Sequence, residues 1–200
     1  MKVTEPTDEQ LMAALSRGDR AALSTLYARH GDLVHRVAWR YLGNADDARD
    51  ITQAVFLGLI DGARLFDAER AGTRFTTWLY RVVANRCLNH RGRAESRLRA
   101  REVDDDALAG LPGDDAEGPE RTAERHELQV RLRGALDRLP ERQRLAVVLS
   151  DVEGLSQNEV GESMACSVGS VESLLIRARQ SLRTFLRTSV EDDHALHHRP

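Results

Sequence analysis

Arginine and asparagine side chains crowd one short stretch of this 200-residue chain. Residues 70–101 carry nine arginines against one acid, a net charge of +8. Arginine forms paired contacts with phosphate, and the amides of Asn85 and Asn89 can donate to and accept from base edges. A basic block of this density needs a polyanion or an acidic partner. The arginine usage by itself is equally typical of a GC-rich genome, since Lys2 is the only lysine.

An acidic block follows directly. Residues 102–127 carry ten acids against Arg121 and Arg125, a net charge of −8. Like-charge repulsion combines there with helix-breaking glycine and proline, which predicts a flexible linker at about 103–119. Its acids either fold back on the basic block or keep the linker extended and solvated.

No group of residues has the spacing of a catalytic or metal site. The sequence contains no phosphate-binding loop, nucleophile motif or HExxH, and Cys87 and Cys166 are isolated. His194 and His198 are four apart, but a frayed terminus is the preferred interpretation. No apolar run approaches membrane-spanning length, and the N-terminus lacks a secretory signal. We expect a cytoplasmic protein that is not an enzyme and uses no cofactor, metal or membrane.

The elements that position the basic block are predicted to be helices. Before it, apolar residues recur at spacings of three, four or seven and place one apolar stripe on each helix: Leu11, Leu15, Ala22, Leu26, Leu33, Val37 and Tyr41. Asp19 is expected to be an N-cap, and Gly43-Asn44 a helix end. Further helices are predicted at about 45–65 and 73–93.

A helix-turn-helix pattern lies beyond the acidic block. One helix ends before Pro140, a second covers 141–150, and Ser156 with Glu159 has the spacing of a capping box. A turn at 165–167 leads to a longer helix, which is typical of a helix-turn-helix, although plain helical hairpins share this spacing. The last helix turns four apolar residues inward: Val171, Leu175, Ala178 and Leu182.

The predicted fold class is all-α, with two small helical domains joined by a flexible acidic linker. We place an N-terminal helical bundle at 7–97 and the linker at 98–124. A four-helix domain with the helix-turn-helix follows at 125–188, and a disordered tail at 189–200. Aromatic residues make up 4% of the chain, so the cores must be aliphatic.

The order and spacing of several motifs resemble the extracytoplasmic-function (ECF) group of bacterial RNA polymerase sigma factors, within the sigma-70 family. The first half matches at Asp8-Glu9-Gln10-Leu11, Arg17-Gly18-Asp19, Leu42-Gly43-Asn44-Ala45-Asp46-Asp47-Ala48, Asp50-Ile51-Thr52-Gln53 and Phe75-Thr76-Thr77-Trp78-Leu79. The second half matches at Leu139-Pro140-Glu141-Arg142-Gln143-Arg144, Glu153-Gly154-Leu155-Ser156 and Ser167-Val168-Gly169-Ser170-Val171-Glu172-Ser173. The resemblance implies a subunit that directs polymerase core to specific promoters for transcription initiation.

The resemblance implies that the first domain docks on the clamp helices of the polymerase largest subunit. The implied contacts are Asp47, Asp50, Gln53 and Phe56. Without the resemblance, a solvated acidic face over a buried Phe56 would be the preferred interpretation.

Three residues depart from the family pattern in this helix. Ala54 stands where an acid is usual, Gly58 where a basic residue is common, and Ile60 where tryptophan is common. Gly58 and Gly62 each cost about 1 kcal/mol relative to alanine, so we expect the end of the helix to be frayed or bent.

The resemblance assigns reading and melting of the downstream promoter element to residues 66–93, with a loop at 67–72 where the family captures a flipped base. The candidate DNA contacts are Arg70, Arg74, Arg81, Asn85, Arg86, Asn89 and Arg91. Trp39 and Trp78 could stack on bases, but core packing is the preferred interpretation.

The last helix matches the one that enters the major groove at the upstream promoter element. The candidate contacts are Ser156, Ser167, Ser170, Glu172, Ser173, Arg177 and Arg179. Glu172 stands where family members often carry a basic residue. Its carboxylate either accepts from cytosine N4 or acts only as a first-turn helix acid.

The implied partners are polymerase core, through the clamp helices and the flap of the second-largest subunit, promoter DNA, and an anti-sigma factor. Two other functions are compatible with the residues. One is a stand-alone helix-turn-helix regulator that binds duplex DNA without polymerase. The other is a sigma-like decoy that acts through protein–protein interaction and directs no transcription.

Overall fold

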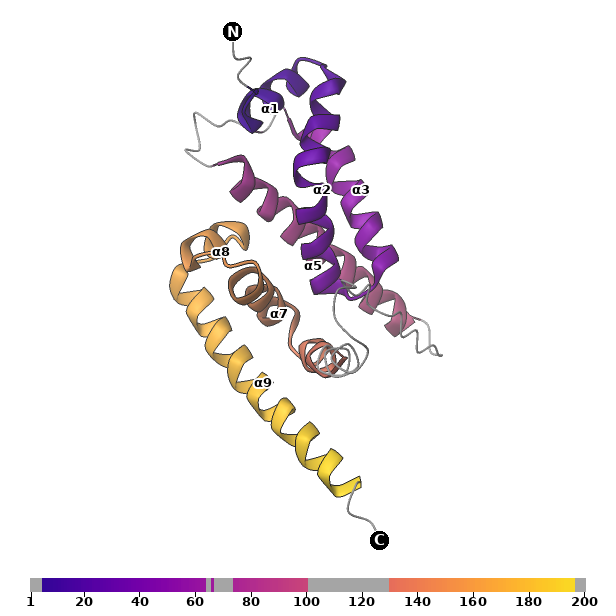
Figure 1. Ribbon diagram of the computed structural model, residues 1–200, viewed down its shortest axis with the longest axis vertical. Coiled ribbons are helices and arrows are strands. Elements are labelled where there is room, and N and C mark those ends of the chain that lie inside the picture. Colours follow the sequence, from indigo (N-terminus) through magenta and orange to yellow (C-terminus); the bar gives the residue numbers. More distant parts are fainter. Residues whose placement is uncertain (1–4, 64–65, 67–73, 101–129, 197–200) are drawn as a thin grey trace, which may run out of the picture.

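Helices form all the regular structure in the described part of the chain, which confirms the all-α prediction. The computed structural model describes residues 5–63, 66, 74–100 and 130–196, of which 93–100 and 188–196 are described for the backbone alone. The predicted linker core, the loop at 67–72 and Arg70 lie outside the described residues. The helices form two units, which Figure 1 shows side by side.

The first unit contains α1 (Asp8–Ser16), α2 (Arg20–Leu42), α3 (Ala45–Gly62) and α5 (Phe75–Ala100). The helix α2 packs against α1, α3 and α5. Leu26 and Val37 of the predicted α2 stripe are buried, whereas predicted Leu33 is half-buried and its neighbour Val34 is fully buried. The unit is therefore a small bundle built around α2.

Short-range hydrogen bonds fix the helix ends in the first unit. Asp19 is the N-cap of α2, and its carboxylate accepts from the amide of Ala21 at 3.0 Å, as predicted. Gly43 ends α2 in the left-handed region, with φ 77°. Asn44 was expected to end the preceding helix. Instead it is the N-cap of α3, where its side chain accepts from the amide of Asp46.

Two helix ends in the first unit differ from the prediction. The helix α3 runs through Gly58 and ends at Gly62, which is earlier than expected. The helix α5 continues past Gly92 to Ala100, beyond the expected end near residue 93. The residues after Gly92 include good helix formers such as arginine and alanine, which offset the cost of one glycine.

The second unit begins with helical residues 130–137, followed by α7 (Glu141–Val147), a π-turn η1 (Val148–Val152), α8 (Gln157–Ser163) and α9 (Val168–Leu196). The capping box of α8 is confirmed: Ser156 Oγ accepts from the amide of Glu159, and Glu159 accepts from the amide of Ser156 at 2.9 Å. The helices α7 and α8 both pack on α9. The predicted helix-turn-helix is formed by α8 and α9.

The helix α9 is longer than predicted. It continues through the segment that we expected to be a disordered tail from residue 189, as far as Leu196. No glycine or proline stands between Val168 and Leu196 except Gly169 in the first turn, so nothing in the sequence breaks the helix earlier. The tail histidines His197 and His198 lie outside the described residues.

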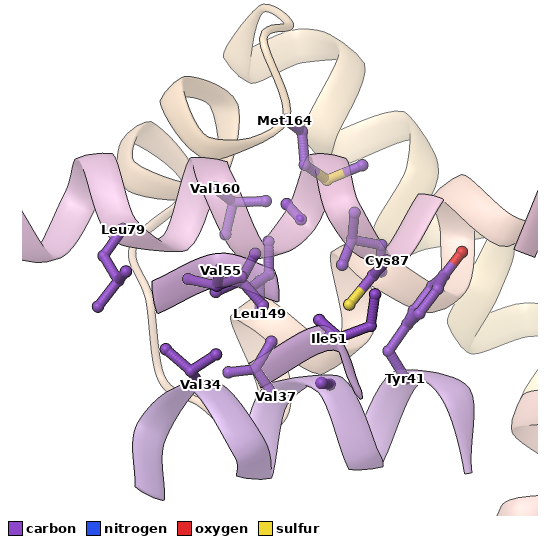
Figure 2. Packing of buried hydrophobic residues seen from close by; sticks show 14 of the residues in the cluster. Val34, Val37, Tyr41, Ile51, Val55, Leu79, Cys87, Leu149, Val160 and Met164 are labelled. Carbon is purple, nitrogen blue, oxygen red and sulfur yellow. The ribbon is translucent and has the colours of Figure 1, made fainter. Parts of the chain in front are cut away.

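The apolar faces of the two units meet in one continuous core. Buried side chains of α2, α3 and α5 belong to the same cluster as Leu149, Val160 and Met164 of the second unit. Figure 2 shows Met164 and Val160 above the side chain of Cys87, which lies on α5. The helix α5 contacts both α7 and α8. The two helical units are thus closed on each other, which the charge pattern did not predict.

Candidate functional site

The predicted acidic face of α3 is open to solvent. Asp50 and Gln53 are exposed, and the half-buried Asp47 lies 3.4 Å from His90 of α5 across an ion-pair contact. Their spacing of three residues places them along one side of the helix. These side chains are therefore available to a partner that supplies basic or amide groups.

Phe56 differs from the other three candidates because it is only 4% exposed. Its ring packs edge-to-face on Tyr27, with 4.9 Å between centroids. The exposed apolar groups at this place are Tyr27 and Leu57, at 53% and 55%. Sequence reasoning missed both, because each directly follows a buried apolar residue and belongs to no periodic apolar pattern of its own.

A groove of about 680 Å³ lies between α2 and α3 beside these residues. Its lining combines apolar Tyr27, Phe56 and Leu57 with polar Asp32 and Gln53. It joins the exposed apolar pair to part of the acidic face. A helix or extended segment with apolar and basic side chains would complement this surface.

One departure from the family pattern has a structural reason. A Cβ added at Gly58 would stand 2.7 Å from Nη2 of Arg86, so the glycine lets the Arg86 guanidinium lie against α3. Gly62 similarly faces the ring of Trp78. Gly58 therefore permits close packing of α5 on α3, whereas a Cβ at Gly62 would make only an ordinary 3.7 Å contact with Trp78, and α3 remains helical across Gly58.

The basic candidates on α5 divide into two sets. Arg81, Asn85 and Asn89 are exposed and spaced by four residues, so they form one stripe along α5. Arg86 lies against α3, and Arg91 lies 3.8 Å from Asp137 of the second unit. The stripe Arg81–Asn85–Asn89 is thus available to contact nucleic acid, and Arg86 is exposed as well although its guanidinium lies against α3.

The two tryptophans pack against the core, which was the preferred interpretation of the sequence. Trp78 contacts Phe66 and Phe75, with centroids 5.3 and 6.0 Å apart. Trp39 is partly buried, and the guanidinium of Arg133 lies 5.7 Å from the centre of its ring. Arg74 is exposed at the start of α5.

Several serines predicted to contact DNA have structural hydrogen bonds. The Ser156 hydroxyl belongs to the capping box and donates to Glu159 at 2.7 Å. Ser167 caps α9, where its Oγ lies 2.9 Å from Oγ of Ser170. The Ser173 hydroxyl donates to the carbonyl of Gly169. Ser156 thus fixes the start of α8, the other serines fix the start of the recognition helix α9, and each remains exposed.

The outward face of α9 carries two candidate arginines, of which one is ion-paired and the other is not. Arg179 forms a two-point pair with Asp151 of η1, and this hydrogen bonding raises the pKa of the Arg179 guanidinium. Arg177 is exposed, and no ion pair is found for it within the described ranges. Glu172 is also exposed, but it is the fifth residue of α9 and the first turn holds no acid, so the alternative role of a first-turn acid does not apply. Among the predicted DNA contacts on α9, Arg177 and Glu172 are therefore the charged side chains for which the described residues offer no ion pair.

Two negative findings concern the residues that the structure describes. They contain no group of three histidine, cysteine or acidic side chains placed to hold a metal ion. None of their helices combines the length and apolar character needed to cross a membrane.

Comparisons with protein families agree with this arrangement. Residues 26–97 match the family model described as Sigma-70 region 2, and residues 129–182 match Sigma-70, region 4. The first match covers α3 and most of α2 and α5, and the second covers the helix-turn-helix. The two matched regions correspond to the two helical units.

Curated relatives match this chain over most of its length. The ECF RNA polymerase sigma factor SigE of Mycolicibacterium smegmatis is 37% identical, over 91% of this chain and 70% of its own length. The RNA polymerase sigma-H factor of Pseudomonas aeruginosa is 32% identical, over 90% and 94%. The ECF RNA polymerase sigma-E factor of Escherichia coli K12 is 30% identical, over 88% and 92%.

Solved structures show the same fold. CnrH, in complex with the cytosolic domain of CnrY, aligns with a TM-score of 0.63 at 27% identity, over 92% of this chain and 99% of CnrH. The sigma factor RpoE of Bartonella quintana, in complex with the anti-sigma factor NepR, aligns with a TM-score of 0.65 at 19% identity, over 82% and 96%. The chain belongs to the sigma-70 family of RNA polymerase sigma factors, in its ECF group.

Proposed function

We propose that this sigma factor uses three separate exposed surfaces to direct polymerase core to promoters. The acidic face and groove of α3 bind the clamp helices of the largest subunit, the α5 stripe holds the melted downstream element, and α9 reads the upstream element. The observation that carries the proposal is that all three surfaces are exposed together while their supporting residues are buried. The protein acts by binding, without catalysis, and works in the cytoplasm.

The proposed polymerase surface is tested by charge reversal on α3. Asp50→Arg should weaken binding to core at least about tenfold, since it places a like charge against a basic partner. Asp61→Arg is the matched control, because Asp61 is an exposed aspartate near the end of the same helix. Binding of the labelled chain to purified core, measured without DNA, reports this step. Equal affinities of the two variants would reject the assignment.

The proposed melting surface is tested on the α5 stripe. Arg81→Ala with Asn85→Ala should reduce the formation of the open promoter complex, because both phosphate and base contacts are removed. Binding to core should be unchanged. Arg20→Ala provides the control, since Arg20 is an exposed arginine on α2 outside the stripe. Strand opening is measured by the fluorescence of a base analogue in the downstream element.

The proposal also covers an anti-sigma partner, which is supported by the two solved relatives and their partner proteins. An anti-sigma factor that covers the α2–α3 groove would compete with core for the same residues. Run-off transcription with core on a genomic promoter library separates the proposal from its rivals. A stand-alone regulator would bind duplex DNA tightly without core, and a decoy would bind core but yield no transcripts.

A further inference from the structure

The start of α9 presents an outward face without a basic side chain. Residues 168–176 contain no lysine, arginine or histidine. The residues that are buried in this stretch, Val171 and Leu175, pack toward the core. Four exposed residues share the opposite side of the helix, because each lies three or four positions from another: Gly169, Glu172, Ser173 and Ile176. We call these four residues the α9 outer face.

An exposed apolar side chain lies in the middle of this face. Ile176 is 65% exposed, more than any other large apolar side chain in the described part of the chain. It has no group that donates or accepts a hydrogen bond, and no charge for a phosphate. The favourable partner that a major groove offers to such a side chain is the C5 methyl group of thymine.

The polar side chains of the α9 outer face accept hydrogen bonds instead of donating them. The Ser173 hydroxyl donates to the carbonyl of Gly169 at 2.9 Å, so its proton is used within the helix. The ionised carboxylate of Glu172 is an acceptor only. Guanine presents the acceptors O6 and N7 in the major groove, so neither side chain matches a guanine edge.

Cytosine is the base that suits the carboxylate of Glu172. Its N4 amino group is a donor, and cytosine has no acceptor beside it in the major groove. Adenine also presents an amino donor, but the adjacent N7 is an acceptor and repels a carboxylate. The DNA phosphates repel the same carboxylate. A base-edge donor is therefore the partner that makes an acid favourable at this position.

Glu172 and Ile176 lie one helical turn apart, at the edge of the molecule that α9 forms in Figure 1. Four residues rise about 6 Å along the helix axis. Base pairs are stacked about 3.4 Å apart, and a recognition helix lies obliquely along the major groove with its first turns toward the base edges. The two side chains therefore face bases that are about one or two base pairs apart.

We propose that Glu172 reads a cytosine and Ile176 reads a thymine in the upstream promoter element, on adjacent or next-but-one base pairs. The inference rests on the proposed function, in which α9 enters the major groove of that element. It adds the identity of the bases. A carboxylate and an apolar side chain select pyrimidine edges, whereas an arginine in the same place selects guanine.

The cytosine contact is tested by selection with the full chain assembled with polymerase core. Bound DNA is sequenced from a library with a randomised upstream element and a fixed downstream element. The native protein should enrich cytosine at one position at least about fivefold over each other base. Glu172→Gln should change this preference to adenine, because an amide donates to N7 and accepts from N6. Glu162→Gln, at an exposed glutamate on α8, is the matched control and should keep the cytosine.

The thymine contact is tested by removing one methyl group from the DNA. Uracil has the same hydrogen-bonding edge as thymine but lacks the C5 methyl. At the selected thymine beside the cytosine, uracil should weaken binding of the native holoenzyme about fourfold. With Ile176→Ala the same replacement should weaken binding less than about 1.5-fold, since the shorter side chain no longer reaches the methyl group.

The variants should keep the fold, because Glu172 and Ile176 are exposed and both replacements favour helix, which circular dichroism verifies. The same selected base with native and Glu172→Gln proteins would overturn the cytosine contact. Equal uracil penalties for native and Ile176→Ala proteins, or no selected thymine within about two positions of the cytosine, would overturn the thymine contact. These outcomes leave the proposed function intact. A holoenzyme that selects no upstream base would contradict the proposed function, and the inference with it.

Discussion

Asp151 and Arg179 form a two-point ion pair that ties the π-turn to the recognition helix. Arg179 Nη2 lies 2.6 Å from Oδ1, and Nε lies 3.1 Å from Oδ2. Such a pair matches the planar guanidinium to both carboxylate oxygens. It also occupies an arginine that would otherwise be free to bind a DNA phosphate.

Asp151→Asn should therefore strengthen binding to duplex DNA. Both side chains are partly exposed, so the loss of the pair should lower the free energy of unfolding by only about 0–1 kcal/mol. Release of Arg179 should add about one phosphate contact and steepen the salt dependence by about 0.9 in slope. Fluorescence anisotropy of the holoenzyme on an upstream-element duplex, across a salt series, measures both. An unchanged slope would show that Arg179 is directed away from the phosphates.

Arg144→Met should be strongly destabilising. The guanidinium is 1% exposed, donates to the carbonyls of Leu136 and Tyr41, and pairs with Asp137. Its removal leaves those two carbonyls without their arginine donor. We expect a loss of about 2–4 kcal/mol in the free energy of unfolding, measured with urea.

Arg142→Met is the matched control for this change. Arg142 lies two residues earlier and is exposed, so its replacement should alter the free energy of unfolding by less than about 0.5 kcal/mol. Similar losses for Arg142 and Arg144 would contradict the assigned role of the buried guanidinium.

Helix positions could be predicted from sequence wherever the signal is local. The cap at Asp19, the capping box from Ser156 and the left-handed Gly43 each depend on residues within about four positions. The π-turn at Val148–Val152 has no such signature, and its sequence reads as ordinary helix. The lengths of α5 and α9 were underestimated because one glycine, or a run of charges, does not by itself end a helix.

Contacts between the units could not be predicted. Arg36 and Glu153 are 117 positions apart, and neither has a sequence pattern that names the other. The charge pattern directed attention to the basic and acidic blocks, whereas the structure pairs single charges on α2 with single charges beyond the linker. Among the site residues, Asp50 and Gln53 are exposed as required, but the exposed apolar groups are Tyr27 and Leu57 instead of Phe56.

The two cysteines should differ in reactivity. Burial raises the pKa of the Cys87 thiol to about 12, while Cys166 is half-buried in the turn before α9. A thiol reagent at pH 8 should therefore modify one cysteine per folded chain and two in denaturant. Rapid modification of both in the folded protein would show that the core around Cys87 opens.

The same thiol contributes to the dependence of stability on pH. The folded pKa lies above the unfolded value, so the folded state binds more protons between about pH 9 and 12. The stability that this pKa difference contributes is fully present below the unfolded pKa and is lost as the pH rises through the folded pKa. Cys87→Ala should reduce this alkaline loss, which unfolding at several pH values measures.

Replacement by alanine should change the free energy of unfolding in opposite directions at two glycines. Gly43 has φ 77°, and the position of an added Cβ coincides with the guanidinium of Arg133. Gly43→Ala should therefore lower the free energy of unfolding by about 1–2 kcal/mol, through backbone strain and displacement of Arg133. Gly92 lies within α5 and has open space around its Cα, so Gly92→Ala should raise stability by about 0.5–1 kcal/mol. Thermal unfolding of the two variants, measured side by side, gives both effects. A stabilising effect of Gly43→Ala would mean that α2 does not end in the left-handed turn.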